Sequence, residues 1–245
     1  MDEPHFLQFL LSTAGAAALL IWAVRLVRTG VERGFAAPLR IWLRHSAKNW
    51  LLAAATGMGA AVFLQSSTAV AVLVSNFVAK GGLAAAVGLA ILLGADVGSA
   101  LVTQLLMVRQ AFLTPLLLLV GVAIFLRGEG NARQVGRILI GLALIFVSLD
   151  MIRAATGPLV GNPSTQMVMA YLGRDLATAF VIGGAFAWVV HSSVAAVLLF
   201  VTLAAQAVLP TTAAAAMILG ANLGGALIAF VLTLSAPMVT RRMVI

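Results

Sequence analysis

The stretch Gln65-Ser66-Ser67-Thr68-Ala69 recurs, with changes, 126 residues later as His191-Ser192-Ser193-Val194-Ala195. A second stretch, Gly94-Ala95-Asp96-Val97-Gly98, recurs at the same distance as Gly220-Ala221-Asn222-Leu223-Gly224. One alignment without gaps joins both pairs, with 16 identities in 50 positions. A polar cluster and a glycine-bracketed element, both duplicated inside long apolar segments, are typical of a transporter with a two-fold site.

The composition indicates a helical membrane protein. Of the 245 residues, 62% are hydrophobic and 9% are charged, and the mean hydropathy is +1.12. A soluble protein of this size needs a more charged surface. The apolar runs are continuous rather than alternating, which excludes a β-barrel. We therefore expect an all-α polytopic membrane protein in contact with lipid. The net charge of +8 lies mostly in loops, so it is not a nucleic-acid-binding surface.

The apolar segments suggest two repeats. They cover about residues 6–24, 50–79, 83–108, 111–126, 138–152, 176–207 and 211–238. We assign residues 1–126 to repeat 1 and 127–245 to repeat 2, which is expected to end short of its last helix. Within repeat 1, the basic and apolar residues of 25–48 predict an amphipathic helix on an anionic leaflet, with a solvated basic loop as the alternative.

Segments 50–79 and 176–207 are ambiguous, because each could span the membrane fully or fold back within it. Each has about thirty residues, or roughly 45 Å of helix at 1.5 Å per residue, against a hydrocarbon core of roughly 30 Å. Each also carries its polar cluster near the middle. The pattern favours two half-length helices folded into a re-entrant hairpin, which is tolerated where protein or water surrounds it.

The charge distribution supports the hairpins. If both enter and leave on one side, eleven of the fifteen basic residues, in 25–48, 127–137 and 241–242, share a side. By the positive-inside rule that side is cytoplasmic. We expect a multi-pass protein of a bacterial plasma membrane, with the N-terminus outside and the C-terminus in the cytoplasm. The two repeats then have opposite orientations, as alternating access requires.

The first tetrad (65–68) and the second tetrad (191–194) are the first candidate site. Four consecutive hydrogen-bonding side chains on one helix would point in four directions, and burying a polar group without a partner costs about 1–3 kcal/mol. At an unwound tip they can converge on one ligand, next to the positive end of a following helix, which suits an oxyanion. The alternative is that the hydroxyl groups bond back to helix carbonyl groups.

The glycine-bracketed element is the second candidate site. Its spacing of small residues also permits close helix packing, which is the alternative explanation for the glycines. A carboxylate at the bilayer centre costs about 2.5–3.5 kcal/mol, so Asp96 should meet a cation, water or a proton there, unless it lies near the interface. Flanking glycines would let the helix break and turn carbonyl groups toward the same ion. Asn222 offers a neutral oxygen at the equivalent position.

These motifs resemble the sodium/phosphate cotransporter family (type II, with its bacterial relatives). The first tetrad and Gly94-Ala95-Asp96-Val97-Gly98 match in repeat 1, and Ser192-Ser193 with Gly220-Ala221-Asn222-Leu223-Gly224 match in repeat 2. The resemblance implies sodium-coupled uptake of inorganic phosphate, with the tetrads near the midplane. Three departures, His191, Val194 and Asp96, could change the substrate or admit proton coupling.

From the motifs and the resemblance we expect a secondary active transporter, not an enzyme. It would take up inorganic phosphate with sodium by alternating access, through one polar chamber shared by both repeats. We expect no cofactor beyond sodium as co-substrate, and we leave oligomerisation open. The expected phosphate-binding residues are Gln65, Ser66, Ser67, His191, Ser192 and Ser193, and the expected sodium-binding residues are Thr68, Asp96 and Asn222.

Several alternatives remain open at this stage. The protein could carry another oxyanion, use a proton gradient, or be a non-transporting membrane subunit. His191 could bond the anion, titrate, or only support the backbone through a neighbouring carbonyl group. An intramembrane hydrolase using His191 and a serine is disfavoured, because adjacent residues on a helix do not face each other.

Overall fold

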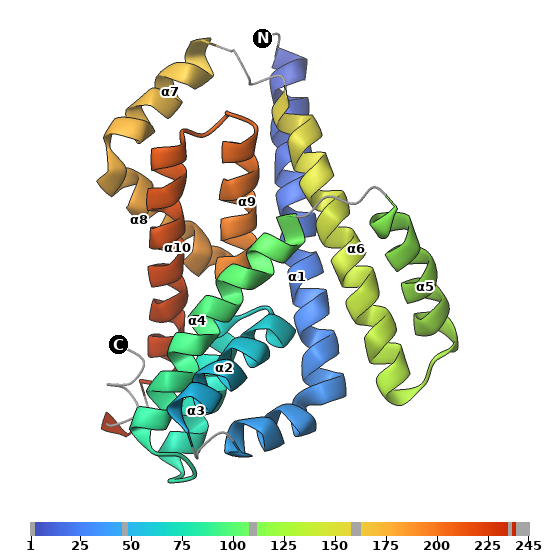
Figure 1. Ribbon diagram of the computed structural model, residues 1–245. Coiled ribbons are helices and arrows are strands. Elements are labelled where there is room, and N and C mark those ends of the chain that lie inside the picture. Colours follow the sequence, from blue (N-terminus) through green and yellow to red (C-terminus); the bar gives the residue numbers. More distant parts are fainter. Residues whose placement is uncertain (1–2, 46–48, 108–111, 158–162, 235–236, 239–245) are drawn as a thin grey trace.

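The computed structural model describes residues 3–45, 49–107, 112–157, 163–234 and 237–238. All secondary structure in these ranges is helical (Figure 1). Leu11–Phe35 within α1, together with α4, α6 and α10, is long and apolar enough to cross a membrane. The prediction of an all-helical chain with several membrane-length helices is confirmed. The helices are α1 (Glu3–His45), α2 (Trp50–Leu64), α3 (Ser67–Ala79), α4 (Ala85–Met107), α5 (Leu113–Arg127), α6 (Gly130–Thr156), α7 (Pro163–Arg174), α8 (Leu176–Val190), α9 (Ser193–Ala205) and α10 (Thr211–Leu232).

The first helix is longer than its apolar part. α1 continues without a break to His45, so the basic segment extends this helix instead of forming a separate one. It packs closely along α6 (Figure 1): a Cβ atom at Gly30 would lie 2.7 Å from a side-chain carbon of Ile138, and one at Gly141 would lie 2.6 Å from a side-chain carbon of Val27. Arg25 and Arg28 therefore belong to a helix that packs along α6.

Both tetrads interrupt a helix in the same way. Gln65 ends α2 in the left-handed region (φ 49°, ψ 35°), and His191 ends α8 there (φ 57°, ψ 32°). The next residues, Ser66 and Ser192, are extended. The hydroxyl oxygen of Ser66 accepts a hydrogen bond from the backbone N–H of Ala69 (3.1 Å), and that of Ser192 accepts one from Ala195 (3.2 Å). Each serine is thus the N-cap of the following helix, and the predicted helix breaks at the tetrads are confirmed.

The helices around the breaks also recur at a fixed distance. The bounds of α2 and α8 differ by 126 residues at both ends, as do those of α3 and α9. The starts of α4 and α10 have the same offset. The backbone turn is the same at both tetrads, and the flanking helices have the same lengths. Each half of the chain therefore contains one copy of the same local unit.

The glycines of the second motif pack helices together and do not break them. A Cβ atom at Gly94 would collide with the carbonyl oxygen of Ala54 on α2, and one at Gly220 with that of Phe180 on α8. α4 and α10 run through their glycine-bracketed elements without interruption. The prediction of a broken transmembrane helix at these elements is therefore wrong, because close packing of α4 on α2 and of α10 on α8 accounts for the glycines.

Besides the packing of α1 along α6, the two halves also meet through their second short helices. α3 packs against α10, and α9 packs against α4. Buried apolar side chains of α9, among them Leu198 and Phe200, belong to a core that also includes residues of α1, α6, α8 and α10. A separate core of α2, α3 and α4 contains Val70, Val74 and Ile91. This crossed packing brings the two helix breaks and the two glycine-bracketed elements into one region.

Candidate functional site

Three cavities lie around the helix breaks and the glycine-bracketed elements. We call them the acidic cavity (about 260 Å³), the middle cavity (about 510 Å³) and the arginine cavity (about 400 Å³). Thr68 lines both the acidic and the middle cavity, and His191 lines both the middle and the arginine cavity. The three spaces therefore share walls made by the two tetrads.

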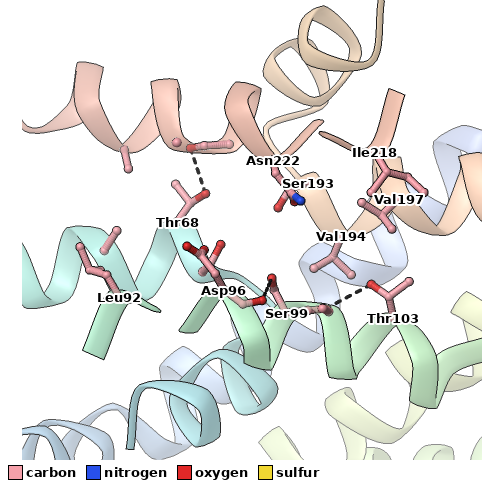
Figure 2. A pocket seen from close by; sticks show the side chains of 16 residues that line it. Thr68, Leu92, Asp96, Ser99, Thr103, Ser193, Val194, Val197, Ile218 and Asn222 are labelled. Atoms are coloured by element: carbon pink, nitrogen blue, oxygen red, sulfur yellow. Dashed lines mark hydrogen bonds between the residues drawn. The ribbon is translucent and has the colours of Figure 1, made fainter. Parts of the chain in front are cut away.

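The acidic cavity is built by both halves of the chain (Figure 2). It contains five of the nine predicted site residues: Ser67, Thr68, Asp96, Ser193 and Asn222. Ser67 and Thr68 come from the first turn of α3, Ser193 begins α9, and Asp96 and Asn222 lie on α4 and α10. Asp96 and Asn222, which are 126 residues apart in the sequence, thus line one space.

Hydrogen bonds order the polar wall of the acidic cavity. The Thr68 hydroxyl group donates to the carbonyl oxygen of Gly225 at 3.2 Å, which joins α3 to α10 (Figure 2). Ser67, at the start of α3, and Asp96 of α4 line the same wall. The hydroxyl group of Thr68 keeps its lone pairs after donating, so it can still accept from, or coordinate, a ligand.

Two polar residues outside the predicted site, Ser99 and Thr103, also line this cavity. Ser99 donates to the carbonyl oxygen of Asp96 (2.8 Å), and Thr103 donates to that of Ser99 (3.2 Å). Both hydroxyl groups bond back to their own helix, as is common for such residues in membrane helices. Their spacing from Asp96, three and seven residues, is a helical-face signal that could have placed them beside it.

The chemistry of the acidic cavity suits a cation with oxygen ligands. One carboxylate, an amide and several hydroxyl groups are hard donors, the kind that Na⁺, Mg²⁺ and Ca²⁺ accept. In the described part of the chain, no cluster of three or more His, Cys, Asp or Glu side chains could hold a metal ion. A single carboxylate with neutral oxygens therefore fits a monovalent ion better than a transition metal.

The arginine cavity holds the other four predicted site residues. Gln65, Ser66, His191 and Ser192 line it, together with Arg25, Arg28, Thr29 and Glu32 of α1. Gln65 is only 6% exposed, and its Oε1 atom has no hydrogen-bond partner among the described residues. His191 is exposed, and its Nδ1 atom lies 3.2 Å from the carbonyl oxygen of Val189. A carbonyl oxygen only accepts, so this contact is a hydrogen bond in the tautomer that carries a hydrogen on Nδ1.

The basic residues of this cavity were expected elsewhere. The sequence analysis placed Arg25 and Arg28 in an interfacial segment, whereas they face the helix breaks in the structure. A terminal nitrogen of Arg25 donates to the carbonyl oxygen of Val190 (3.2 Å), the last residue of α8. Nε of Arg28 lies 2.8 Å from Oε1 of Glu32. The spacing of Arg25, Arg28 and Glu32, three and four residues, is the signal that puts them on one helix face.

The nine predicted residues are thus brought together around two cavities rather than one chamber. The tetrads are divided: their first two residues face the arginine cavity, and the polar residues that follow face the acidic cavity. Asn76 of α3 lines the middle cavity. The division falls at the start of the following helix: the left-handed residue and the extended residue of each break face the arginine cavity, and the first residues of α3 and α9 face the acidic cavity.

Comparison with known proteins gives a consistent assignment. The family model described as "Na+/Pi-cotransporter" matches residues 19–154 and 159–245. The chain is 41% identical, over 234 residues, to the "Putative inorganic phosphate export protein YjbB" of Escherichia coli (strain K12), and equally to the protein of that name from Salmonella typhimurium. The alignments cover 95% of this chain and 43% of each relative, so the chain spans less than half of their length.

A more distant relative matches a shorter part of the chain. The "Uncharacterized protein YqeW" of Bacillus subtilis (strain 168) is 28% identical over 161 residues, which is 66% of this chain and 52% of that protein. No solved structure matches the chain.

Proposed function

The chain belongs to the Na+/Pi-cotransporter family, and from this premise we propose that it moves inorganic phosphate across a membrane by alternating access, coupled to sodium. The observation that carries the proposal is the pair of helix breaks. Two tetrads with the same backbone turn lie 126 residues apart in the sequence and wall the same set of cavities. Broken helices at a repeat interface are where secondary transporters bind their substrates.

Phosphate is the substrate that the breaks suit. α3 and α9 each begin at a serine N-cap, and the positive ends of helices attract anions. In this proposal Ser66, Ser67, Ser192 and Ser193 contact the anion, with Gln65 and His191 orienting it. The relatives from E. coli and Salmonella are named for inorganic phosphate, which supports the same substrate class.

Sodium is the coupling ion that we assign to the acidic cavity. Asp96 supplies a negative charge, and Thr68 and Asn222 supply neutral oxygens in the same space. Coupling to cations is needed for uptake because moving a phosphate dianion into a negative cell interior costs roughly 5 kcal/mol per 100 mV, at about 2.3 kcal/mol for each charge. A proton that takes the place of sodium on Asp96 is the remaining alternative for this cavity.

We propose that the two halves are inverted, an arrangement common among transporters that use alternating access. The proposal is supported by the direction of α4, which rises from the lower part of the molecule in Figure 1, whereas α10 descends from the upper part. It is also supported by helix length: the 15-residue helices α2 and α8 are roughly 22 Å long at 1.5 Å per residue, short of the roughly 30 Å hydrocarbon core. We propose that α2–α3 and α8–α9 are re-entrant hairpins of repeats 1–126 and 127–245.

The orientation that we propose keeps the basic loops in the cytoplasm of a bacterial cell. Arg127, Arg133 and Arg137, around the start of α6, would lie inside, the N-terminus outside and the C-terminus inside. The sequence has no cysteine, so single cysteines can report sidedness directly. A Glu129→Cys variant in intact cells should resist an impermeant maleimide, and labelling from outside would contradict this orientation.

Export is a second candidate for the direction of net transport. The E. coli and Salmonella relatives are named as phosphate export proteins. The same membrane potential that opposes uptake of a dianion drives its exit, so a carrier with weak sodium coupling would release phosphate. The two candidates differ in coupling and share one substrate.

Reconstitution of the full chain separates these possibilities. In proteoliposomes, an inward sodium gradient should drive labelled phosphate above its equilibrium level, and replacing sodium with choline should prevent this. Flux that follows only the potential and the phosphate gradient would support export instead. A complete lack of phosphate movement under both conditions would overturn the proposal and leave the non-transporting subunit. The family matched is a transporter family, so the hydrolase alternative has no support.

A further inference from the structure

We propose that Arg25 and Arg28 of α1 bind the transported anion in the arginine cavity, beside the two helix breaks. The inference rests on phosphate being the substrate, as proposed above. It adds two arginines of α1 to the tetrad residues expected to bind the anion, and it places the anion in a cavity that Asp96 does not line.

Both arginines face the same space as both N-caps. Arg25 and Arg28 lie three residues apart, on one face of α1, and they line the arginine cavity with Ser66 and Ser192. The cavity of about 400 Å³ greatly exceeds the roughly 30 Å³ of one water molecule. It therefore has room for an oxyanion between the guanidinium groups and the starts of α3 and α9.

Arg25 is held in place at one of the breaks. Its bond to the carbonyl oxygen of Val190 (3.2 Å) lies at the C-terminal end of α8, where a cation is favoured. A guanidinium group has five N–H donors in a fixed fork, and this bond uses one of them. Such a fork matches the oxygens of a phosphate ion, which is the geometry that makes arginine a frequent phosphate ligand.

Arg28 has a partner that an anion can replace. Its ion pair with Glu32 is partly exposed, with side-chain exposures of 37% and 46%, and pairs this accessible are weak. A phosphate dianion carries more charge than the Glu32 carboxylate and can take over the guanidinium group. Glu32 then becomes the group that recaptures Arg28 when the anion leaves, so binding stays reversible.

A buried amide oxygen without a hydrogen-bond partner is independent evidence for a ligand. Gln65 lines the same cavity and is 6% exposed, and its Oε1 atom has no hydrogen-bond partner in the described part of the chain. A buried polar atom left without a partner is destabilising. Hydrogen phosphate brings both acceptor oxygens and an O–H donor, so it can satisfy the arginines and the amide together.

The proposed anion site and the carboxylate of Asp96 lie in different cavities. Asp96 lines the acidic cavity and is absent from the lining of the arginine cavity. Like charges in a common space would repel strongly where water is scarce. A phosphate bound at Arg25 and Arg28 avoids repulsion by Asp96, and the carboxylate of Glu32, which also lines the arginine cavity, is paired with Arg28. The acidic cavity stays available for a cation.

Chemical protection tests the site in the unmodified protein. The purified full chain is treated with phenylglyoxal, with and without inorganic phosphate, and the modified arginines are quantified by mass spectrometry. Phosphate should slow modification of Arg25 and Arg28 but not of Arg33, an exposed residue of α1 that lines none of the three cavities. Equal rates at Arg28 with and without phosphate would overturn the inference.

Substitution tests the same point by affinity. Arg28→Gln should weaken phosphate binding to the purified chain by about tenfold or more, since charge-assisted bidentate contacts are among the strongest hydrogen bonds. Arg28→Lys should fall between this variant and the wild type, because lysine keeps the charge but not the fork. Arg33→Gln is the matched control and should bind phosphate as the wild type does. If Arg28→Gln fails to fold, the protection experiment decides.

The outcomes separate this inference from the proposed function. Wild-type protein that transports phosphate, together with an Arg28→Gln variant that binds it equally well, would overturn the arginine site alone. Wild-type protein that neither binds nor moves phosphate would overturn the proposed function and the inference with it.

Discussion

The hydroxyl group of Thr68 on α3 donates a 3.2 Å hydrogen bond to the carbonyl oxygen of Gly225 on α10. The bond links the first half of the chain to the second at the wall between the acidic and the middle cavity. At the equivalent positions, 126 residues away, the pair is Val194 and Ser99. The two halves thus have the same backbone arrangement but differ at this contact. The hydroxyl group of Thr68 in the first half corresponds to the apolar side chain of Val194 in the second.

The first prediction concerns the space beside Thr68. Gly225→Ala would put a Cβ atom 3.3 Å from Cβ of Ser193, so that side chain must give way, and 3.5 Å from Oγ1 of Thr68, which is an ordinary contact. We expect phosphate flux to fall several-fold, with a stability loss of about 1 kcal/mol, at the low end for an overpacked contact. Flux in proteoliposomes and thermal unfolding in detergent measure the two effects. Gly59→Ala is the control, since nothing lies within 4 Å of its added Cβ atom, and equal flux in both variants would contradict the prediction.

The second prediction concerns the packing of α4 on α2. In Gly94→Ala the added Cβ atom collides with the carbonyl oxygen of Ala54, and backbone cannot move aside cheaply. We expect a loss of at least about 3 kcal/mol, the upper range for overpacking, and little folded protein. Size-exclusion chromatography after detergent extraction checks this against Gly15→Ala, which meets nothing within 4 Å. Normal yield and normal elution of Gly94→Ala would show that α4 and α2 are not packed in this way.

The third prediction concerns the carboxylate of the acidic cavity. Asp96→Asn removes the negative charge but keeps the shape, and asparagine already stands at the equivalent position 222. We expect the sodium concentration for half-maximal phosphate transport to rise about tenfold, which corresponds to about 1.4 kcal/mol. Phosphate affinity at saturating sodium should change little, because the anion is expected in the other cavity.

Asp150→Asn is the matched control for this experiment. Asp150 is an exposed carboxylate on α6 that pairs with Arg153 and lines none of the three cavities. Its substitution should leave the sodium dependence unchanged. An Asp96→Asn variant with the sodium dependence of the wild type would remove the assignment of sodium to the acidic cavity.

The fourth prediction concerns the N-cap of α9. Ser192→Ala removes the oxygen that accepts from the N–H of Ala195 (3.2 Å), and loss of such a cap costs about 1 kcal/mol. Ser192→Thr keeps a hydroxyl group and should retain most of the stability. Thermal unfolding in detergent compares the two variants. Should both melt together at the wild-type temperature, the serine does not cap this helix.

The positions of the helix breaks could be predicted because the signal is local. Four polar side chains inside an apolar run of about thirty residues cannot all be satisfied on one helix in lipid, wherever the rest of the chain lies. The duplication at a fixed offset added a second, independent copy of the same signal. Gln65 and His191 have the same left-handed backbone conformation although their side chains differ. The backbone turn is therefore the same in both copies of the motif, whereas the side-chain chemistry is not.

The role of the glycines could not be predicted from their pattern. Gly94 and Gly98 permit either an unwound helix or a close contact, because both need only the absence of a side chain. The outcome depends on whether the backbone of another helix packs against the glycines. In the structure the backbone of α2 does so, at Ala54 and Met58. The sequence analysis chose the unwound helix because Asp96 between the glycines suggested an ion held by carbonyl groups.

The sequence by itself determined an all-helical membrane protein, two copies of one helix-breaking unit and the set of polar residues at the breaks. These follow from hydropathy, from the cost of unpaired polar groups in lipid and from an internal repeat, none of which needs a neighbour. Only the tertiary structure decided how those residues are shared between an acidic and an arginine cavity, and that Arg25 and Arg28 join the second. The reason is that cavity walls are made by side chains distant in sequence, and their meeting depends on how α1, α4 and α10 pack around the short helices.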